Sequence, residues 1–342
     1  MAAGREEDQE SRRRISFGVN VNTRVPLIYP AQYTAENLLD FSKHVEELGY
    51  DSVWVGDSIL AKPRLDPLSI LSAISSRTTR VKLGTACMIA PLRNPILLAR
   101  TWATLDILSR GRTSMAVCIG PGTLEYEKLG IHFGNRGRMV EEYVQLLRRL
   151  WQEDGVTFSG KYYNVSNVTL NPKPIQKPAP PICIVGWPYG HGAEDREEEV
   201  VAKSKKLAES IFTRVVKHGD GWMFDGFATP EGVRDGVENL KRIAKSEGKD
   251  FSKLDIVYQM TLNVNSSKSE AESEAREFIS KYYGNLSRPM ESWGPFGSAK
   301  VCIDWIERFR SAGVTTIILR FASPDQSGQL KRFTEQIYSA FR

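Results

Sequence analysis

The sequence has few of the residues on which most hydrolases and metalloenzymes depend. It contains four cysteines and four histidines in 342 residues, and no two cysteines are spaced C-x-x-C. We therefore expect neither a metal site nor a disulfide framework. Three of the cysteines lie in apolar, strand-like runs, where a free thiol packs as a small hydrophobic group. This usage favours a reducing, cytoplasmic setting.

Long apolar runs and a strong excess of one charge are also missing. No segment approaches the ~18 apolar residues of a membrane span. The net charge is +5, and the Lys and Arg residues are spread along the chain, which favours a mixed-charge surface over a nucleic-acid-binding face. Most of residues 1–14 are charged or polar, and no long apolar stretch follows them, so we interpret them as a disordered tail and not as an export signal.

Residues 15–342 alternate between β-rich runs and runs of helical period, which predicts one α/β domain. The expected strands are 15–21, 51–56, 81–89, 113–120, 181–186, 221–225, 254–264 and 315–321. The expected helices are 34–48, 67–76, 95–108, 136–151, 199–217, 230–245, 270–282, 298–311 and a last one from 329. Eight strands alternating with helices predict a (β/α)8 TIM barrel. An open doubly wound sheet is the alternative, but it usually carries a glycine fingerprint after its first strand, and none is present here.

Three segments interrupt this alternation. Residues 155–180 contain a plausible hairpin at 157–163, residues 190–199 form a charged insertion, and residues 283–297 resemble a long loop. Each follows a strand or helix in a way that would let it fold over the C-terminal mouth of the barrel. Long loops are often lids, and a lid function and a merely decorative role both remain open.

Candidate catalytic residues follow the second and fourth strands, because a (β/α)8 enzyme has its active site at the carboxyl ends of its strands. They are Asp57, Ser58 and Glu125, which would orient or protonate a substrate. The acid–base set is otherwise sparse, and no H-E-x-x-H, G-x-S-x-G or Walker motif is present. Redox chemistry on a cofactor needs fewer protein groups, because the cofactor performs the difficult step.

Two turns at the same mouth have little side chain. Gly120-Pro121-Gly122 and Gly186-Trp187-Pro188 would expose backbone N–H groups and let a phosphate or a planar ring approach closely. Taken alone, each is also explained by a tight strand-to-helix turn without a ligand, and their position at the same mouth is what favours a cofactor site.

The order and spacing of several short motifs resemble those of the bacterial luciferase-like monooxygenase superfamily. The motifs include residues 65–68, 83–86, 93–95, 104–112, 126–130, 136–138, 147–151, 172–178 and 219–222. The similarity runs from about residue 15 to 342 and is densest between 50 and 186.

The resemblance implies a (β/α)8 barrel and a cofactor, either FMN in its reduced form FMNH2, used with O2, or the deazaflavin F420, used for hydride transfer. We lean slightly to F420, because the Ile119–Gly122 turn is similar to that of F420-dependent reductases. In the family the third strand often carries a bulge or a non-proline cis peptide under the ring, which maps to Ala86–Cys87. The implied cofactor-binding residues are Thr85, Ala86, Cys87, Met88, Asn94, Gly120, Pro121, Gly122, Gly186, Trp187 and Pro188.

The chain departs from the family where many relatives have a histidine, since Ser58 follows Asp57 at the end of the second strand. The leading hypothesis is an oxidoreductase that acts on a small organic substrate, with O2 or a separate flavin reductase as further partners and a homodimer as the assembly. A degenerate flavin-binding barrel without activity is one alternative. A cofactor-free hydrolase or lyase, which would need Asp57 and Glu125 to converge, is another.

Overall fold

The computed structural model describes residues 14–120, 122–132, 134, 136–188, 198–224, 226–284 and 289–342. Residues 1–13 of the expected tail lie outside this range. So do Pro121 and residues 189–197, which include most of the charged insertion.

The main sheet has eight long strands whose hydrogen-bonded order closes on itself. The order is β1 (Ser16–Asn20), β2 (Ser52–Val55), β3 (Lys82–Ile89), β4 (Thr113–Cys118), β7 (Ile182–Val185), β8 (Gly221–Phe224), β9 (Asp255–Val264) and β11 (Thr316–Phe321), and β11 pairs again with β1. The short β10 (Phe296–Gly297) extends β9 in parallel. Helices separate these strands along the chain, so the predicted (β/α)8 barrel is confirmed.

The chain divides into two compact units, and each is described by itself. One unit comprises residues 21–185 and 218–220, and we call it the N-terminal unit. The other comprises residues 1–20, 186–217 and 221–342, and we call it the C-terminal unit.

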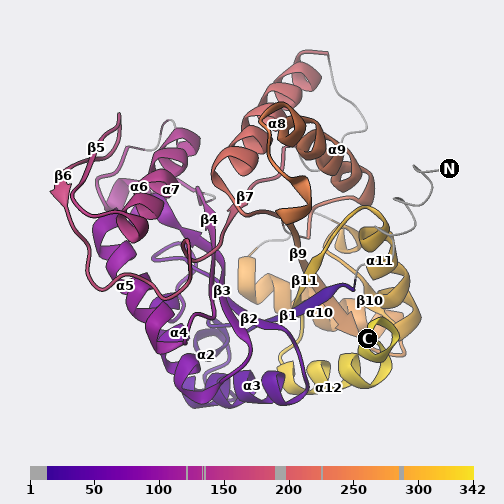
Figure 1. Cartoon of the computed structure of the whole chain (residues 1–342). Helices are drawn as coiled ribbons and strands as arrows, with labels where there is room; N and C mark the ends of the chain where they lie inside the picture. The colour runs from indigo at the N-terminus through magenta and orange to yellow at the C-terminus, as the bar shows by residue number, and fades with distance from the viewer. Residues whose placement is uncertain are drawn as a thin grey trace. The chain divides into compact units, whose positions relative to one another are not determined.

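The N-terminal unit contains parallel strands β2, β3, β4 and β7. Its helices are α2 (Val25–Ile28), α3 (Ala35–Glu47), α4 (Pro67–Arg77), α5 (Pro95–Leu108), α6 (Leu124–Lys128) and α7 (Arg136–Gln152). Figure 1 shows α3, α4 and α5 side by side along the sheet. The expected hairpin is present as antiparallel β5 (Val156–Ser159) and β6 (Asn164–Val168).

The C-terminal unit contains β1, β11, β9 and β8, also parallel. Its helices are α8 (Glu198–His218), α9 (Pro230–Ser246), α10 (Lys268–Tyr283), α11 (Ala299–Ser311) and α12 (Gln326–Gln336). The segment expected to be a loop at 283–297 includes a 3-10 turn at Met290–Ser292 and strand β10.

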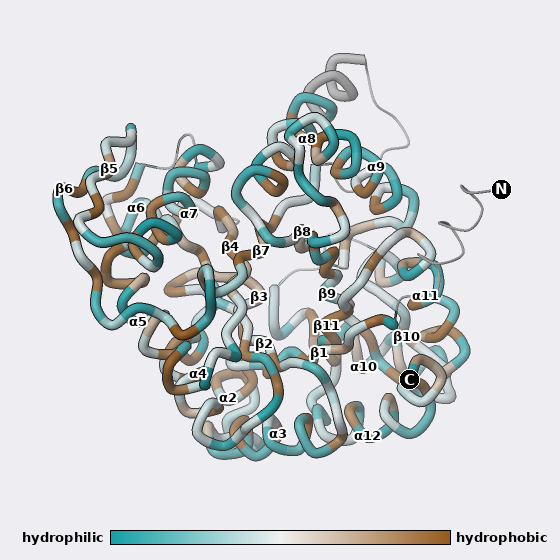
Figure 2. The backbone as a smooth tube through the Cα atoms, viewed as in Figure 1, coloured by the Kyte–Doolittle hydropathy of each residue, from teal (hydrophilic) through white to brown (hydrophobic). Residues whose placement is uncertain are grey.

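Local sequence signals explain where several helices begin. Helices α4, α5 and α9 each start with proline at the first helical position, after a capping Asp66, Asn94 or Thr229 whose side chain accepts a backbone N–H. Figure 2 shows hydrophobic and hydrophilic residues alternating along the outer helices, as expected when one side of a helix packs on a sheet.

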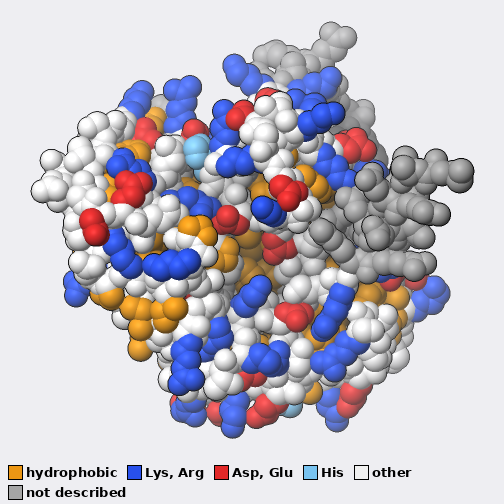
Figure 3. All heavy atoms as spheres, viewed as in Figure 1, with side chains coloured by type: hydrophobic (Ala, Val, Ile, Leu, Met, Phe, Trp, Pro, Cys, Tyr) orange, Lys and Arg blue, Asp and Glu red, His pale blue; other side chains and the backbone are white. Residues whose placement is uncertain are grey.

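Charged side chains of both signs are interspersed on the face drawn in Figure 3. None of the helices in the described part of the chain is both long and apolar enough to cross a membrane.

Candidate active site

Asp57 follows β2 and is held by a buried ion pair. Its side chain is 1% exposed, and its two oxygens lie 2.5 and 2.9 Å from Nη1 and Nη2 of Arg93. Asp57 also accepts the backbone N–H of Ile89, at 2.9 Å, from the end of β3. Burial lowers the pKa of Arg93, but the hydrogen bond and charge of Asp57 outweigh it, so the pKa is raised overall. The pair therefore joins the carboxyl end of β2 to the end of β3 and the start of α5.

Glu125, at the start of α6, holds the loop that follows β2. Its Oε1 accepts the Ser58 hydroxyl at 2.8 Å and the backbone N–H groups of residues 59, 60 and 61 at 2.7, 2.8 and 3.1 Å. Burial alone would raise the pKa of Glu125, but these hydrogen bonds, led by that of Leu60, lower it overall. The carboxylate is therefore ionised at neutral pH and carries no proton to donate.

The three predicted catalytic residues thus lie on neighbouring loops of the N-terminal unit, but each carboxylate has its own set of donors. The hydroxyl of Ser58 donates to Glu125 and accepts the N–H of Lys62 at 2.9 Å. A cofactor-independent hydrolase would require a pair of free carboxylates. In this arrangement both Asp57 and Glu125 are already engaged by donors of the chain.

Strand β3 has the predicted irregularity. Its register with β4 shifts between Thr85 and Met88, and the peptide bond between Ala86 and Cys87 is cis. Thr85 and Met88 are fully buried, and the Thr85 hydroxyl exchanges hydrogen bonds with the backbone of Ala116 in β4. Cys87 is partly buried and packs against the apolar cluster of Ile89, Leu92, Cys118 and Tyr126. Of the four predicted contact residues, only Cys87 is partly exposed, and Thr85, Ala86 and Met88 are buried.

Three small residues, Gly56, Gly84 and Ala86, form a small-residue layer on or directly after the neighbouring strands β2 and β3 of this unit. Trp54 pairs in register with Gly84, and its ring fills the space where a side chain at residue 84 would lie. Gly56 and Ala86 follow two residues further along the same strands, and a Cβ at residue 56 would lie 3.7 Å from the Ala86 carbonyl oxygen. The space beside each glycine is filled by a neighbouring side chain, Arg64 at residue 56 and Trp54 at residue 84.

Arg64, which the sequence did not single out, lies beside Gly56. A Cβ at residue 56 would collide with Nη1 of Arg64, and the Nε of Arg64 donates to the Lys62 carbonyl at 3.2 Å. Its only sequence signal is its position in the loop after a strand.

Gly120, with a φ of +70°, shapes the turn after β4. The strand ends at Cys118, two residues earlier than predicted. The Gly120 carbonyl accepts from Arg136 Nη1 at 2.9 Å, and the Ile119 carbonyl accepts from the Tyr126 hydroxyl at 2.7 Å. Around Gly122, no described atom lies within 4 Å of the place of a Cβ, so this position is open. Pro121 lies outside the described residues.

Asn94, a predicted cofactor contact, is the N-cap of α5. Its Oδ1 accepts the N–H groups of Ile96 and Leu97 at 3.0 and 3.2 Å. Helix capping thus satisfies the side-chain oxygen of Asn94 without a ligand.

In the C-terminal unit, the expectation that Gly186 offers its N–H to a ligand is wrong. That N–H donates to the Met223 carbonyl at 3.1 Å, and the Gly186 carbonyl accepts from Trp222 Nε1 at 2.7 Å. Trp187 stacks on Trp222, with ring centroids 6.0 Å apart and planes within 3°, and Pro188 is buried. The sequence did not reveal that this turn continues the ladder to β8.

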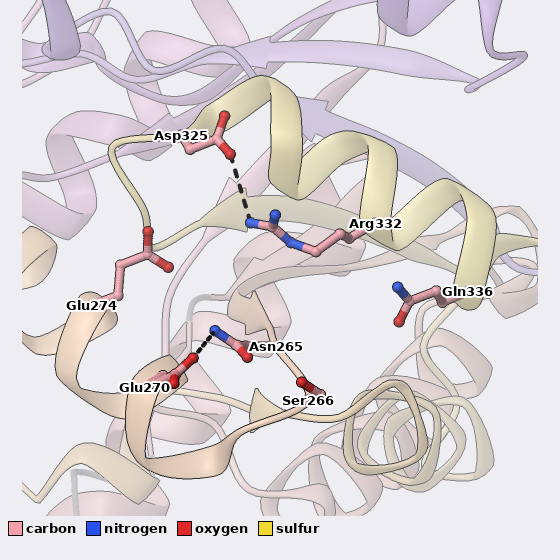
Figure 4. A pocket seen from close by; sticks show the side chains of 7 residues that line it. All are labelled: Asn265, Ser266, Glu270, Glu274, Asp325, Arg332 and Gln336. Carbon is pink, nitrogen blue, oxygen red and sulfur yellow. Dashed lines mark hydrogen bonds and ion pairs between the residues drawn. The ribbon is translucent and has the colours of Figure 1, made fainter.

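A polar pocket of about 550 Å³ lies in the C-terminal unit between α10 and α12 (Figure 4). Its acidic residues are engaged by neighbours: Glu270 accepts from Asn265, Glu274 accepts from Asn263 and Ser323, and Asp325 caps α12. No group of three His, Cys, Asp or Glu residues suited to a metal ion occurs among the described residues.

Comparison with known proteins places this geometry in a family. The family model described as luciferase-like monooxygenase matches residues 15–194 and 208–316. The chain belongs to the luciferase-like monooxygenase family. The resemblance predicted from the sequence motifs is therefore confirmed.

The most similar curated relatives include two proteins named F420-dependent glucose-6-phosphate dehydrogenase. The one from Amycolatopsis mediterranei is 26% identical over 91% of this chain and 96% of its own length. The one from Kineococcus radiotolerans is 34% identical, but over 46% of this chain and 49% of its own length, so this match spans about half of that relative.

Solved structures with the same fold include a monooxygenase and an F420-dependent dehydrogenase. The monooxygenase RslO1 from Streptomyces bottropensis has a TM-score of 0.79 at 20% identity, covering 96% of this chain and 100% of that one. An F420-dependent secondary alcohol dehydrogenase, in complex with an F420-acetone adduct, has a TM-score of 0.74 at 23% identity, covering 96% and 99%.

Proposed function

We propose that this protein is an oxidoreductase that binds F420 or FMN and acts on a small organic substrate, with F420 preferred. The observation that carries the proposal is the register shift of β3 between Thr85 and Met88, where the family resemblance puts the ring, in a chain of the luciferase-like family. The preference for F420 is supported by the two relatives whose names state F420 dependence.

The residues present fit a planar ring of this kind. The space at Gly122 is free of described atoms, and Cys87 on the irregular part of β3 is only partly buried. Bound F420 would supply hydride transfer. Bound reduced FMN would supply electrons to O2, and a separate flavin reductase would provide the reduced FMN in the cell. Ala86, Cys87 and Gly122 would contact the cofactor.

Asp57, Ser58 and Glu125 are proposed as positioning residues. The Asp57–Arg93 pair fixes the ends of two strands, and Glu125 fixes the loop that carries Ile59 and Leu60. These two side chains are 36% and 44% exposed, so they offer apolar surface to a bound molecule. They would cover an organic substrate and exclude water from it.

A homodimer and a cytoplasmic location complete the proposal. The four cysteines are all free in the described structure, which suits a reducing compartment. Sedimentation equilibrium of the purified protein tests the dimer, and a monomer at micromolar concentration would contradict it.

Cofactor binding tests the function itself. The purified chain is titrated separately with F420 and with FMN, oxidised and reduced, and binding is followed by fluorescence. We expect saturable binding of at least one of them, and binding of neither would remove the basis of the proposal.

A further inference from the structure

Two buried polar side chains directly follow β1 and have no role in the site described so far. Asn22 is 3% exposed and Thr23 is 1% exposed. Across the described residues, neither Asn22 Nδ2 nor Thr23 Oγ1 has a hydrogen-bond partner. Buried polar groups in proteins are almost always satisfied by protein, water or ligand, so these two adjacent groups are available to a bound molecule.

The backbone around these residues makes its own hydrogen bonds, so at these positions it is the two side-chain groups that lack a partner among the described residues. The N–H of Val21 donates to the Trp54 carbonyl at 2.7 Å, and the Thr23 carbonyl accepts the N–H of Leu65 at 3.1 Å. Asn22 Oδ1 accepts the N–H of Arg24 at 3.3 Å. This contact orients the amide, so the group left over is the Nδ2 donor.

Asn22 and Thr23 lie at the carboxyl end of β1. The strand ends at Asn20, and both residues follow within three positions. A (β/α)8 barrel binds its ligands at the carboxyl ends of its strands, so these two side chains belong to the end of the barrel where a ligand is expected.

A third donor belongs to the same region of the N-terminal unit. The hydrogen bond from Leu65 to Thr23 joins the loop after β2 to the segment of residues 21–24, and this loop carries Arg64. The guanidinium of Arg64 lies beside Gly56, whose missing side chain gives it room. Asn22, Thr23 and Arg64 thus lie on two segments that a backbone hydrogen bond joins.

We propose that Asn22, Thr23 and Arg64 form a subsite for an anionic or carbonyl oxygen. Donors of this kind match an acceptor that carries negative charge. The proposal rests on the function proposed above, and it leaves two sources for the oxygen: a ring oxygen of the reduced cofactor, or a carboxylate of the substrate.

The test uses the full-length variants Asn22→Leu, Thr23→Val and Arg64→Met, with Thr101→Val as a control. Thr101 is exposed, and its hydroxyl contacts only its own helix, at the Leu97 carbonyl, in the contacts described. Each protein is titrated with F420 and FMN in both redox states, and then with benzoate in the presence of saturating cofactor. Melting temperature is measured without ligand.

We expect each site variant to weaken one of these ligands about tenfold, as the loss of a hydrogen bond to a charged group implies. Weaker cofactor binding assigns the oxygen to the ring, whereas weaker benzoate binding alone assigns it to the substrate. Thr23→Val should melt no lower than the wild type, because it removes a buried hydroxyl that has no partner in the ligand-free protein.

Unchanged affinity for all three ligands in a wild type that binds cofactor would overturn the subsite and leave the proposed function standing. A lower melting temperature with unchanged affinities would likewise show that Asn22 and Thr23 serve only the fold. If the wild type itself binds neither cofactor, the proposed function fails first, and benzoate binding to the ligand-free variants then decides the subsite.

Discussion

Asp57 and Arg93 form a bidentate ion pair between the end of β2 and the start of α5, with nitrogen–oxygen distances of 2.5 and 2.9 Å. The side chain of Asp57 is 1% exposed and that of Arg93 is 17% exposed. Removing one partner of a buried pair is costly, because the other charge stays buried without compensation.

We therefore predict that Asp57→Ala lowers the free energy of unfolding by about 3–5 kcal/mol. Urea denaturation measures this change. The control is Asp304→Ala, which removes the exposed pair with Lys300 and should cost less than about 1 kcal/mol. Equal losses in the two variants would contradict the structural weight given to the Asp57–Arg93 pair.

The anchoring of the 58–61 loop by Glu125 should depend on pH. The pKa of Glu125 is lowered in the folded protein, so its contribution to stability is fully present above the unfolded-state pKa, about 4.3, and is lost as the pH falls through the lower folded value. We expect Glu125→Gln to be less stable than the wild type at pH 7, and the difference to shrink below about pH 4.

Chemical denaturation from pH 3 to pH 8 tests this dependence on Glu125. If the stability difference between wild type and Glu125→Gln stayed constant over the whole range, the ionised carboxylate would not be the group that holds the loop.

Two glycines of neighbouring strands should respond differently to alanine. At residue 84 the added methyl meets the rigid ring of Trp54, including Cδ2 at 2.6 Å, so Gly84→Ala should cost about 1–3 kcal/mol or more. At residue 56 it meets the flexible end of Arg64, so Gly56→Ala should change stability little but displace that guanidinium.

Thermal unfolding and cofactor titration of both variants separate these effects. Gly122→Ala, at the open turn, serves as the control for stability. Because Gly56→Ala displaces the Arg64 guanidinium, the interpretation of the small-residue layer predicts that Gly56→Ala and Arg64→Met affect cofactor binding alike. It fails if Gly56→Ala binds cofactor as the wild type does while Arg64→Met does not.

The sequence predicted the barrel because its signals are local. Strand and helix periods, and prolines after capping residues such as Asp66 and Asn94, lie within a few residues of the structure they specify. The short helices α2 and α6 were not predicted, since four or five residues are too few to show a helical period.

The roles of the site residues could not be predicted in the same way, because their partners are distant in sequence. Arg93 is 36 positions from Asp57, and Glu125 is 64 to 67 positions from the groups that it accepts. Position after a strand marked Asp57 and Glu125 as polar groups at the mouth, but it did not indicate that other parts of the chain already engage them. The same holds for Gly186, whose N–H is taken by a strand 37 residues away.

Aromatic packing supports the turn at Gly186 in the C-terminal unit. Trp222→Phe keeps a ring beside Trp187 but removes the N–H that donates to the Gly186 carbonyl at 2.7 Å. We predict a loss of about 1–2 kcal/mol in urea denaturation, as for a buried acceptor left without its donor. A variant as stable as the wild type would mean that this hydrogen bond contributes little to the turn.

The central claim is that the layer formed by Gly56 and Ala86 receives a redox ring, and its most direct test is equilibrium titration of the wild type and Ala86→Leu with F420 and FMN. The account predicts saturable binding by the wild type and at least a tenfold loss in Ala86→Leu, because the larger side chain would occupy the place proposed for the ring. Equal binding by the two proteins, or no binding by the wild type, would contradict it.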